Sequence, residues 1–403
     1  MANNNENKIL NVPHLRFPEF TGEWESFKLT ELGKFIGGGT PSSSNLSFWA
    51  GSIPWISSSD IKEDSINNIS ISRYITEEAI EKSTTKYCPA PVILIVSRVG
   101  VGKVALSYTS LCTSQDFCNI IEIKCHPVFL SYNLLRTMKR KSREVQGTSI
   151  KGITSDELQK IRVFIPQDKD EQNKISNILT LLDERIATQN KIIEDLKKLK
   201  SAIIDYIFNN EVLSFRKRIH LSDVATKITQ KNTNNHVSNV LSNSANQGII
   251  PQSEVFDREI ANEDNTSNYF VISQNDFVYN PRKSATAPYG PINRYYGQTD
   301  GVISPLYLCF RSHNIDVEYL GWYFKSDSWH KFVYQNGDTG VRHDRVSIKD
   351  EIFFSMPLFI HNADEQIEIA KRLNKIESFV KQEEQYLFLL ESQKLYLLQQ
   401  MFI

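Results

Sequence analysis

The stretch from Ser97 to Lys103, Ser-Arg-Val-Gly-Val-Gly-Lys, combines glycines with a lysine in the way that phosphate-binding loops do. A loop of the Walker type needs a glycine at its first position and a serine or threonine directly after the lysine. Here Ser97 stands in place of that glycine, and Val104 follows Lys103. The pattern therefore argues against nucleotide hydrolysis by this segment.

A second stretch, Asn280-Pro281-Arg282, begins like the catalytic loop of adenine methyltransferases. That loop needs two consecutive prolines followed by an aromatic residue, and the second proline and the aromatic residue are both missing here. The sequence also lacks a glycine-rich loop for the cofactor. The 8 histidines and 5 cysteines have none of the spacings of metal ligands. We therefore expect no catalytic residue, no bound cofactor and no metal in this chain.

The chemistry that remains is recognition of DNA by polar side chains on loops that follow strands. Arginine and lysine donate to guanine O6 and N7, whereas asparagine and glutamine suit adenine. Pro91–Val96 reads as a buried strand, and Asp276–Arg282 takes the equivalent place in the second half of the chain. The candidate DNA-binding residues, on the loops after these strands, on the last loop of each half and on one early turn, are Thr40, Ser97, Arg98, Lys103, Thr148, Ser149, Lys151, Arg282, Lys283, Ser284, Arg342, His343 and Arg345.

Lys151 and Arg342 are cations at equivalent points of two otherwise divergent halves, which suggests a shared phosphate or base contact. They align at the offset of 191 residues that also aligns Ile161 with Ile352. An ordinary solvated charge explains any one candidate residue equally well, whereas each loop taken as a set favours DNA. The basic run 136–143 is open to two interpretations, a solvated helix face or a phosphate contact.

Composition sets limits on the class of protein. A chain of 403 residues has room for two or three domains, and a net charge of −1 argues only against a free-standing nonspecific DNA binder. Five scattered cysteines without a C-x-x-C pair are typical of a reducing compartment. The polar N-terminal segment is no signal peptide, and no apolar run is long enough to cross a membrane. We therefore expect a cytoplasmic protein with no membrane partner.

The elements that must hold the loops are indicated by a long helical stretch that occurs twice. The copies begin at Asp170-Glu171-Gln172 and at Asp364-Glu365-Gln366, which is 194 residues later, and they stay in register without a gap. Their apolar residues step by alternating fours and threes, the spacing of a helix that packs on a partner helix. The residues expected at the interface of the helix pair are Ile175, Leu179, Leu182, Ile186, Gln189, Ile193, Leu196, Lys200, Ile203, Ile369, Leu373, Ile376, Val380, Glu383, Leu387, Leu390, Lys394 and Leu397.

Two polar interruptions of this stripe, Gln189/Glu383 and Lys200/Lys394, indicate the direction of pairing. Parallel pairing in register would place Lys200 against Lys394. Antiparallel pairing can instead join Lys200 to Glu383 and Lys394 to Gln189, so that each buried polar group has a partner. We therefore expect an antiparallel, intramolecular coiled coil. The alternative is that both lysines extend to solvent.

The globular halves repeat as well. Leu29–Ile36 aligns with Leu221–Ile228, and Ile161–Pro166 aligns with Ile352–Pro357. We expect an α+β protein in which two globular domains, related by a pseudo-twofold axis, are joined by two long antiparallel helices. The expected bounds are 1–166 for the first globular domain, 167–210 for the central helix, 211–357 for the second globular domain and 358–403 for the last helix.

The order of several short motifs resembles that in the specificity subunits of type I restriction-modification systems. In the first half these motifs are Pro13-His-Leu-Arg-Phe-Pro-Glu-Phe20 with Trp24, Gly38-Gly-Thr-Pro41 with Trp49, Ile53-Pro-Trp55, Asp60, and Ser97-Arg98 with Gly102-Lys103. Each half then leads from a proline, Pro166 or Pro357, into a helix that begins with Glu-Gln. The second half departs from the pattern, because Thr229–Thr233 replaces the Gly-Gly-Thr-Pro turn and no Ile-Pro-Trp follows.

The resemblance implies a non-catalytic subunit that binds double-stranded DNA. Each globular domain would be a target recognition domain for one half of a split, asymmetric sequence, and the helix pair would set the spacer. The resemblance also implies two modification subunits, which carry S-adenosylmethionine and methylate adenine. Restriction subunits that use ATP and Mg²⁺ would complete the complex. The main alternative is a scaffold whose heads bind proteins and whose helices homodimerise, but internal duplication with compensating charges favours pairing within one chain.

Overall fold

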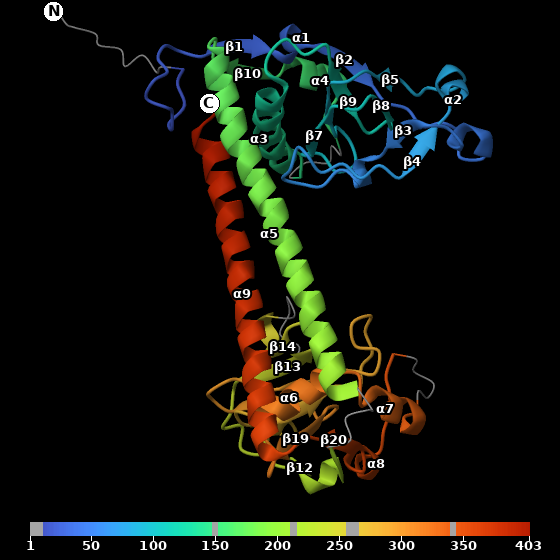
Figure 1. The fold of residues 1–403 in the computed structure, drawn as a ribbon, viewed down its shortest axis with the longest axis vertical. Helices are drawn as coiled ribbons and strands as arrows, with labels where there is room; N and C mark the ends of the chain where they lie inside the picture. Colours follow the sequence, from blue (N-terminus) through green and yellow to red (C-terminus); the bar gives the residue numbers. More distant parts are fainter. Residues whose placement is uncertain (1–10, 147–151, 210–215, 255–265, 339–343) are drawn as a thin grey trace, which may run out of the picture. The chain divides into compact units, whose positions relative to one another are not determined.

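The computed structural model describes residues 11–146, 152–209, 216–254, 266–338 and 344–403. The chain divides into two compact units: unit 1 spans Met1–Lys191 and Gln385–Ile403, and unit 2 spans Ile192–Glu384. The two long helices are α5, Lys169–Asn209, and α9, Ala363–Gln400 (Figure 1). Each unit therefore contains one globular part together with a segment of each long helix.

The described part of unit 1 has one small sheet and two larger ones. The small sheet pairs β1 (Glu25–Lys28) with β10 (Arg162–Ile165), so the strand that enters the globular part lies beside the strand that leaves it. One larger sheet has the antiparallel order β2 (Lys34–Gly37), β9 (Cys118–Ile121), β6 (Val92–Ile95) and β7 (Val104–Ser107). The other has the order β4 (Arg73–Ile75), β3 (Ile53–Ile56), β8 (Leu111–Thr113) and β5 (Tyr87–Cys88), in which the pair β3–β8 is parallel.

Unit 2 repeats this topology strand by strand. Its small sheet pairs β11 (Lys217–His220) with β20 (Pro357–Ile360). Its larger sheets have the orders β12 (Ala225–Lys227), β19 (Leu308–Ser312), β16 (Phe277–Tyr279), β17 (Ile292–Arg294) and β14 (Gly248–Pro251), β13 (Val240–Ser244), β18 (Gly301–Ile303), β15 (Phe270–Ile272). The pair β13–β18 is again parallel. Strand pairing has thus been retained where most side chains have changed, which supports the inference of an internal duplication.

Shorter helices complete each globular part. Unit 1 has α1 (Leu29–Leu32), α2 (Glu77–Glu81), α3 (Pro127–Gln146) and α4 (Ser155–Lys160), and unit 2 has α6 (Val317–Lys325), α7 (His330–Asn336) and α8 (Asp350–Phe354). Helix α4 begins at a capping box, in which Thr154 Oγ1 accepts from the N–H of Glu157 (3.2 Å) and the Glu157 carboxylate accepts from the N–H of Thr154 (2.8 Å). Helix α6 is capped by Asp316, which precedes it and whose side chain accepts from the N–H of Tyr319 (2.8 Å).

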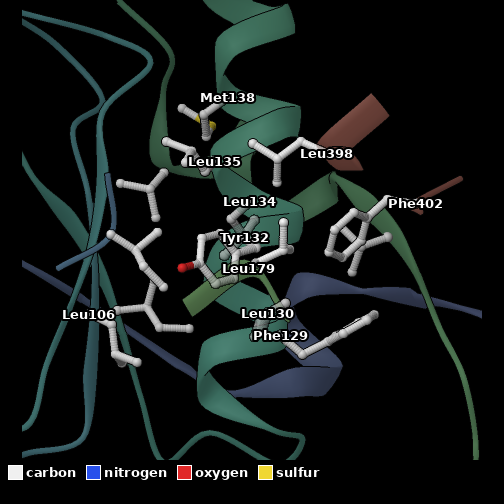
Figure 2. Close-up of a cluster of buried hydrophobic side chains, with 14 of the residues drawn as sticks. Leu106, Phe129, Leu130, Tyr132, Leu134, Leu135, Met138, Leu179, Leu398 and Phe402 are labelled. Atoms are coloured by element: carbon white, nitrogen blue, oxygen red, sulfur yellow. The ribbon is translucent and has the colours of Figure 1, made fainter. Parts of the chain in front are cut away.

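The core of unit 1 joins its sheets, α3 and segments of both long helices. The buried α3 side chains include Phe129, Leu130 and Leu134, and Figure 2 shows Leu398 of α9 and Phe402, which follows α9, beside this helix. Burying one such side chain stabilises the fold by about 1.5–3 kcal/mol. In unit 2 the core is built in the same way, from α6 aromatic residues with Ile204, Phe208 and Leu373 of the long helices.

A glutamine fixes the start of both long helices in the same way. Gln172 donates from Nε2 to the carbonyl of Pro166 (2.8 Å) and accepts at Oε1 from the N–H of His126 (2.9 Å). In the second copy, Gln366 donates to the carbonyl of His361 (2.8 Å) and accepts from the N–H of Asp316 (3.0 Å). Both glutamines are buried. The recurring Glu-Gln motif therefore ties each long helix to its globular part by satisfying main-chain groups that burial would otherwise leave unpaired.

Glu171, which precedes Gln172, has a separate role in unit 1. It is 1% exposed and accepts hydrogen bonds from Arg16 Nε (2.7 Å) and from Trp24 Nε1 (3.1 Å). The hydrogen bond to Glu171 raises the pKa of Arg16. The aromatic N-terminal arm is thus fixed to the start of α5. Its counterpart in the second copy, Glu365, accepts instead from the N–H of Asn362 (3.2 Å), as a helix cap does.

Ion pairs and a hydrogen bond between α5 and α9 give the relative direction of the two helix segments within each unit. In unit 1 Lys394 pairs with Asp183, and Arg185 Nη2 donates to the hydroxyl of Tyr386 (2.6 Å). In unit 2 Lys200 pairs with Glu377 (2.5 Å) and Lys197 pairs with Glu384 (2.6 Å). In both units the residue number rises along α9 as it falls along α5, so the segments are antiparallel.

The predicted register was wrong by six residues. Lys200 pairs with Glu377 instead of Glu383, and Lys394 pairs with Asp183 instead of Gln189. Acidic and amide side chains recur along both stripes, so the spacing of apolar residues alone admits several registers. All the predicted stripe residues are nevertheless buried or half-buried, including Lys394 and Lys200.

We expect the Lys200–Glu377 pair to stabilise unit 2 in a pH-dependent way. Burial alone would raise the pKa of Glu377, but the hydrogen bond and charge of Lys200, with neighbouring lysines, leave it below the ordinary value of 4.5. A carboxyl group with a pKa lowered by folding stabilises the folded state above its unfolded-state pKa, and this contribution is lost as the pH falls through the folded-state pKa. The difference in Tm between the unmodified chain and Glu377→Gln should therefore shrink below about pH 4.5. Glu368→Gln, at an exposed ion pair with Arg372, is the control, and a pH-independent difference would contradict the prediction.

Candidate nucleic-acid interface

The loop between β6 and β7 is the first part of the candidate interface in unit 1. Ser97 is 6% exposed, and its N–H and its hydroxyl both donate to the carbonyl of Asp116 (2.8 and 3.1 Å). Ser97 therefore holds the base of the loop, whereas Arg98 is exposed to solvent. Gly100 and Gly102 have φ angles of +88° and +112°, which residues with a Cβ atom rarely adopt. The glycines that resembled a phosphate loop thus serve the turn of the main chain.

Two other segments lie against this loop. Lys103 Nζ donates to the carbonyl of Ser58 (3.2 Å), and the N–H of Ile153 donates to the carbonyl of Ser97 (2.7 Å). We call residues 57–60, 97–103 and 152–154 loop cluster 1. The predicted residues Thr148, Ser149 and Lys151 lie outside the described residues.

The Gly-Gly-Thr-Pro turn is held by close main-chain packing. The N–H of Gly39 donates to the carbonyl of Thr113 (2.8 Å), and Trp55 Nε1 donates to the carbonyl of Gly39 (3.0 Å). A Cβ atom on Gly38 would lie 2.0 Å from the carbonyl oxygen of Ser114, so this position has room only for glycine. Thr40 is exposed, and its hydroxyl donates to the side-chain carbonyl of Gln115.

The motif residues Trp49, Trp55 and Asp60 join one network that includes the 57–60 segment of loop cluster 1. Trp49 packs edge-on against Trp55, with ring centroids 5.1 Å apart, and the Arg73 guanidinium lies 4.5 Å from the Trp55 ring centroid. Arg73 also pairs with Asp60, and Asp60 Oδ2 accepts from the N–H of Ser57 (2.7 Å). The network therefore fixes the turn at 58–60 against the sheet. Arg73 comes from β4, where it stands opposite Trp55 of β3.

Unit 2 has a corresponding arrangement. Asn280 Nδ2 donates to the carbonyl of Asn243 (3.0 Å), and Thr286 Oγ1 donates to Asn246 Oδ1 (2.9 Å), so the loop after β16 lies against the turn after β13. Gly290, which aligns with Gly102, also has a positive φ, of +83°. We call residues 244–247, 280–287 and 344–346 loop cluster 2.

The last segment of loop cluster 2 is joined to the loop after β16 by main-chain hydrogen bonds. The N–H of Lys283 donates to the carbonyl of Asp344 (2.8 Å), and the N–H of Val346 donates to the carbonyl of Pro281 (2.9 Å). Arg282, whose side chain is 68% exposed, has its Nε 4.0 Å from the Asp344 carboxylate. The structure thus brings Arg282, Lys283, Ser284 and Arg345 together. The predicted residues Arg342 and His343 lie outside the described residues.

The basic run 136–143 belongs to α3, and several of its cations are already paired. Arg136 Nη1 donates to the carbonyl of Ile403 (2.6 Å), Lys139 pairs with Asp64 (2.6 Å), and Lys141 pairs with Glu144 (2.7 Å). Arg140 and Arg143 are exposed. These contacts favour the interpretation of this run as a helix face over that of a dedicated phosphate site.

Several residues of the loop clusters escaped sequence reasoning. Ser57, Ser58 and Ser59 stand on the turn after β3, and Asn246 and Gln247 stand on the turn after β13. Asn246 and Gln247 are exposed amides followed by a glycine, a signal for a turn that the sequence did carry. Within the ranges that the structure covers, no group of His, Cys, Asp and Glu side chains is arranged to hold a metal. No helix of the described part is long and apolar enough to span a membrane.

Comparison with known proteins gives matches to type I restriction enzyme specificity subunits. Residues 21–198 match the family model of the type I restriction modification DNA specificity domain. The chain is 32% identical over 202 residues to the MjaIX type I restriction enzyme specificity subunit of Methanocaldococcus jannaschii, a match that covers 47% of this chain and 46% of that protein. It is 33% identical over 192 residues to the EcoR124I/EcoR124II specificity subunit of Escherichia coli, with 46% of each chain covered. The matched part thus spans about half the length of these relatives.

Solved structures extend the likeness in fold to almost the whole chain. The crystal structure of a type I restriction-modification system S subunit from M. genitalium matches with a TM-score of 0.56 at 14% identity, over 97% of this chain and 99% of that chain. A chain from a study of complex assembly and conformational transition of the type I R-M system matches with a TM-score of 0.58 at 14% identity, over 93% and 95%. Residues 21–198 are therefore similar to the type I restriction modification DNA specificity domain, and the chain has the fold of the S subunits of type I restriction-modification systems.

Proposed function

We propose that this chain is a non-catalytic DNA-recognition subunit in which loop clusters 1 and 2 each bind one half-site of a split target. The observation that carries the proposal is the repeated topology of the two units, which places the same loops together in both. The side chains on these loops differ, with Arg98 and Lys103 in unit 1 but Arg282, Lys283 and Asn246 in unit 2. Different side chains on the same framework would recognise different half-sites.

The exposed side chains suit contacts in the major groove. An arginine can donate two hydrogen bonds to guanine O6 and N7, and Arg98 and Arg282 both have exposed side chains on loops with main-chain support. Asparagine and glutamine suit adenine, and Asn246 and Gln247 are the exposed amides of loop cluster 2. Thr148, Ser149, Lys151, Arg342 and His343 remain candidates by their place in the sequence. The two globular domains proposed from the sequence, 1–166 and 211–357, hold these two clusters.

Partner subunits would dock on the long helices. Large apolar side chains are exposed on both helices, and exposed apolar surface of this kind marks binding sites for other proteins. They are Ile178, Leu181, Ile192, Leu199 and Tyr206 on α5, and Ile367, Phe379, Tyr386, Phe388, Leu389, Leu395 and Tyr396 on α9. We propose that two modification subunits cover them, supply S-adenosylmethionine and share the contacts to DNA phosphates. That sharing explains how a chain of net charge −1 acts on DNA.

The rest of the complex follows from the same proposal. Restriction subunits would add ATP- and Mg²⁺-dependent cleavage, and the helix pair would set the spacer between the half-sites. The site of action is the DNA in the cytoplasm. Methylation of adenine would then take place on the modification subunits and not on this chain.

Loss of one arginine should impair one half-site only. Arg98→Ala and Arg282→Ala should each weaken binding of the assembled methylase by about 1–3 kcal/mol, as expected for a base contact. Binding to DNA sites with substituted base pairs should show a relaxed sequence preference in one half-site for Arg98→Ala and in the other half-site for Arg282→Ala. Lys198→Ala is the control, because Lys198 is an exposed cation of α5 paired with Glu194. Unchanged affinity and unchanged sequence preference in both variants would refute the assignment of the loops.

Charges on the exposed helix faces should block assembly. Leu181 and Phe388 are 60% and 66% exposed, so Leu181→Glu and Phe388→Glu should change the stability of the free chain by no more than about 0.5 kcal/mol. Each should nevertheless abolish co-purification with the modification subunit, because the complex would bury the new charge. Tyr108→Glu, at a site 68% exposed and outside the helices, should assemble normally. Normal assembly of both helix variants would show that partners dock elsewhere.

A further inference from the structure

The ion pairs Asp183–Lys394 and Lys200–Glu377 are copies of one another in the duplicated sequence. Asp183 aligns with Glu377, and Lys200 aligns with Lys394, at the offset of 194 residues. Each pair therefore joins the lysine of one helix copy to the acid of the other. We call them the register pairs. Their lysines belong to the predicted stripe, and each was expected to pair with another residue. Among the ion pairs of the described residues, Lys394 has the most buried lysine side chain, with 6% exposed.

In unit 1 the register pair also binds the globular part. Lys394 Nζ donates to the main-chain carbonyl of Asp64, and the Asp64 carboxylate pairs with Lys139 of α3 (2.6 Å). The hydroxyl of Tyr132, also on α3, donates to Asp183 Oδ2 (2.8 Å). A single buried ammonium group thus connects α9, α5 and the loop that leads to β4. Asp64 has a φ of +60°, so its main-chain carbonyl is presented from a tight turn.

In unit 2 the register pair lies beside an equivalent connection to α6. Trp322 Nε1 donates to Asn374 Oδ1 (2.8 Å), and Asn374 Nδ2 donates to Glu318 Oε2 (3.2 Å). Asn374 stands about one turn before Glu377 on α9. The Lys325 ammonium lies 4.5 Å from the ring centroid of Trp322, and its charge helps to lower the pKa of Glu377. Helix α3 thus contacts the register pair itself in unit 1, whereas α6 is attached one turn away from the register pair in unit 2.

We propose that Lys394 and Lys200 are positioning residues that fix the register of α9 against α5 and seat each globular part at a set place along the helices. The apolar stripe alone tolerates a shift by one turn or one heptad, because leucine and isoleucine can replace one another along it. A shift would instead remove Lys394 from Asp183 and from the Asp64 carbonyl together and leave charges buried without partners. The consequence for spacer length rests on the proposed function, whereas register and seating do not.

The two register pairs differ in burial, which predicts unequal effects. The side chains of Asp183 and Lys394 are 7% and 6% exposed, whereas those of Lys200 and Glu377 are 21% and 26% exposed. Water can therefore replace a lost charged partner more easily at the Lys200–Glu377 pair than at the Asp183–Lys394 pair. Substitution of Lys394 should therefore disturb the register more than substitution of Lys200.

The test compares Lys394→Met, Lys200→Met and Lys394→Arg in the full chain assembled with its modification subunits. Cys125, the half-buried cysteine, is first replaced by serine. Nitroxide labels at Glu184 and Gln385, both exposed in unit 1, then give a direct measure of the register. The unmodified chain should give one narrow distance distribution, and Lys394→Met should broaden it or shift it by about one helical turn, 5.4 Å. Lys394→Arg retains the charge and should restore the narrow distribution. Lys198→Met, at an exposed ion pair of α5, is the matched control.

The second measurement is methylation of a DNA library in which the spacer between the half-sites varies. Lys394→Met should reduce the preference for the normal spacer by about tenfold or more, as expected when a buried charge loses its partner. The double variant Asp183→Asn, Lys394→Met removes both charges, so it tests the same point if the single variant does not fold. A normal distance distribution and a normal spacer preference in the double variant would overturn the proposal. If the unmodified complex lacked any sequence preference, the proposed function would fail, while the label distances would still decide the register.

Discussion

When a helix packs in parallel and in register against its own duplicate, equivalent residues face one another. Antiparallel packing avoids this. In this chain the constraint falls on a lysine of the inner stripe, present as Lys200 and again as Lys394. Antiparallel packing within each unit gives each lysine an acid from the other copy, Glu377 or Asp183. The same arrangement gives each unit one segment of both helices, and therefore the same framework on which to build a globular part.

The framework explains how the globular parts diverged in sequence without losing their fold. Strand order is the same in the two units, and the glutamines Gln172 and Gln366 make equivalent hydrogen bonds to main-chain groups. Main-chain groups are present whatever the side chains are, so these contacts constrain little of the surrounding sequence. The loops after β6 and β16 stand on that framework, and their side chains were free to change. Retained strand pairing with changed loops agrees with the proposed recognition of two different half-sites by one fold.

Much of the fold could be predicted from the sequence, and the predictions that failed did so for physical reasons. The long helices, their antiparallel direction and the strand before Ser97 follow from periodicity and from matching polar interruptions. The register of the helix pair cannot be predicted in this way, because Glu383 and Glu377 are both acids on α9. Only long-range packing selects one of them as the partner of Lys200. The cation–π contact of Arg73 with Trp55 depends on the pairing of β4 with β3, and the hydrogen bond from Lys103 to Ser58 joins loops 45 residues apart; the sequence indicates neither contact. The sequence did not indicate that Ser97, a candidate DNA contact, also holds the base of the loop through hydrogen bonds to the carbonyl of Asp116.

The central claim is that two units of one topology recognise the two halves of one split DNA site. Sequencing of modified adenines in cells that carry this chain with its modification subunits tests it most directly. The account predicts a motif of two dissimilar blocks separated by a fixed number of unspecified bases, with a modified adenine in each block. A single continuous motif, or modification without any motif, would contradict it.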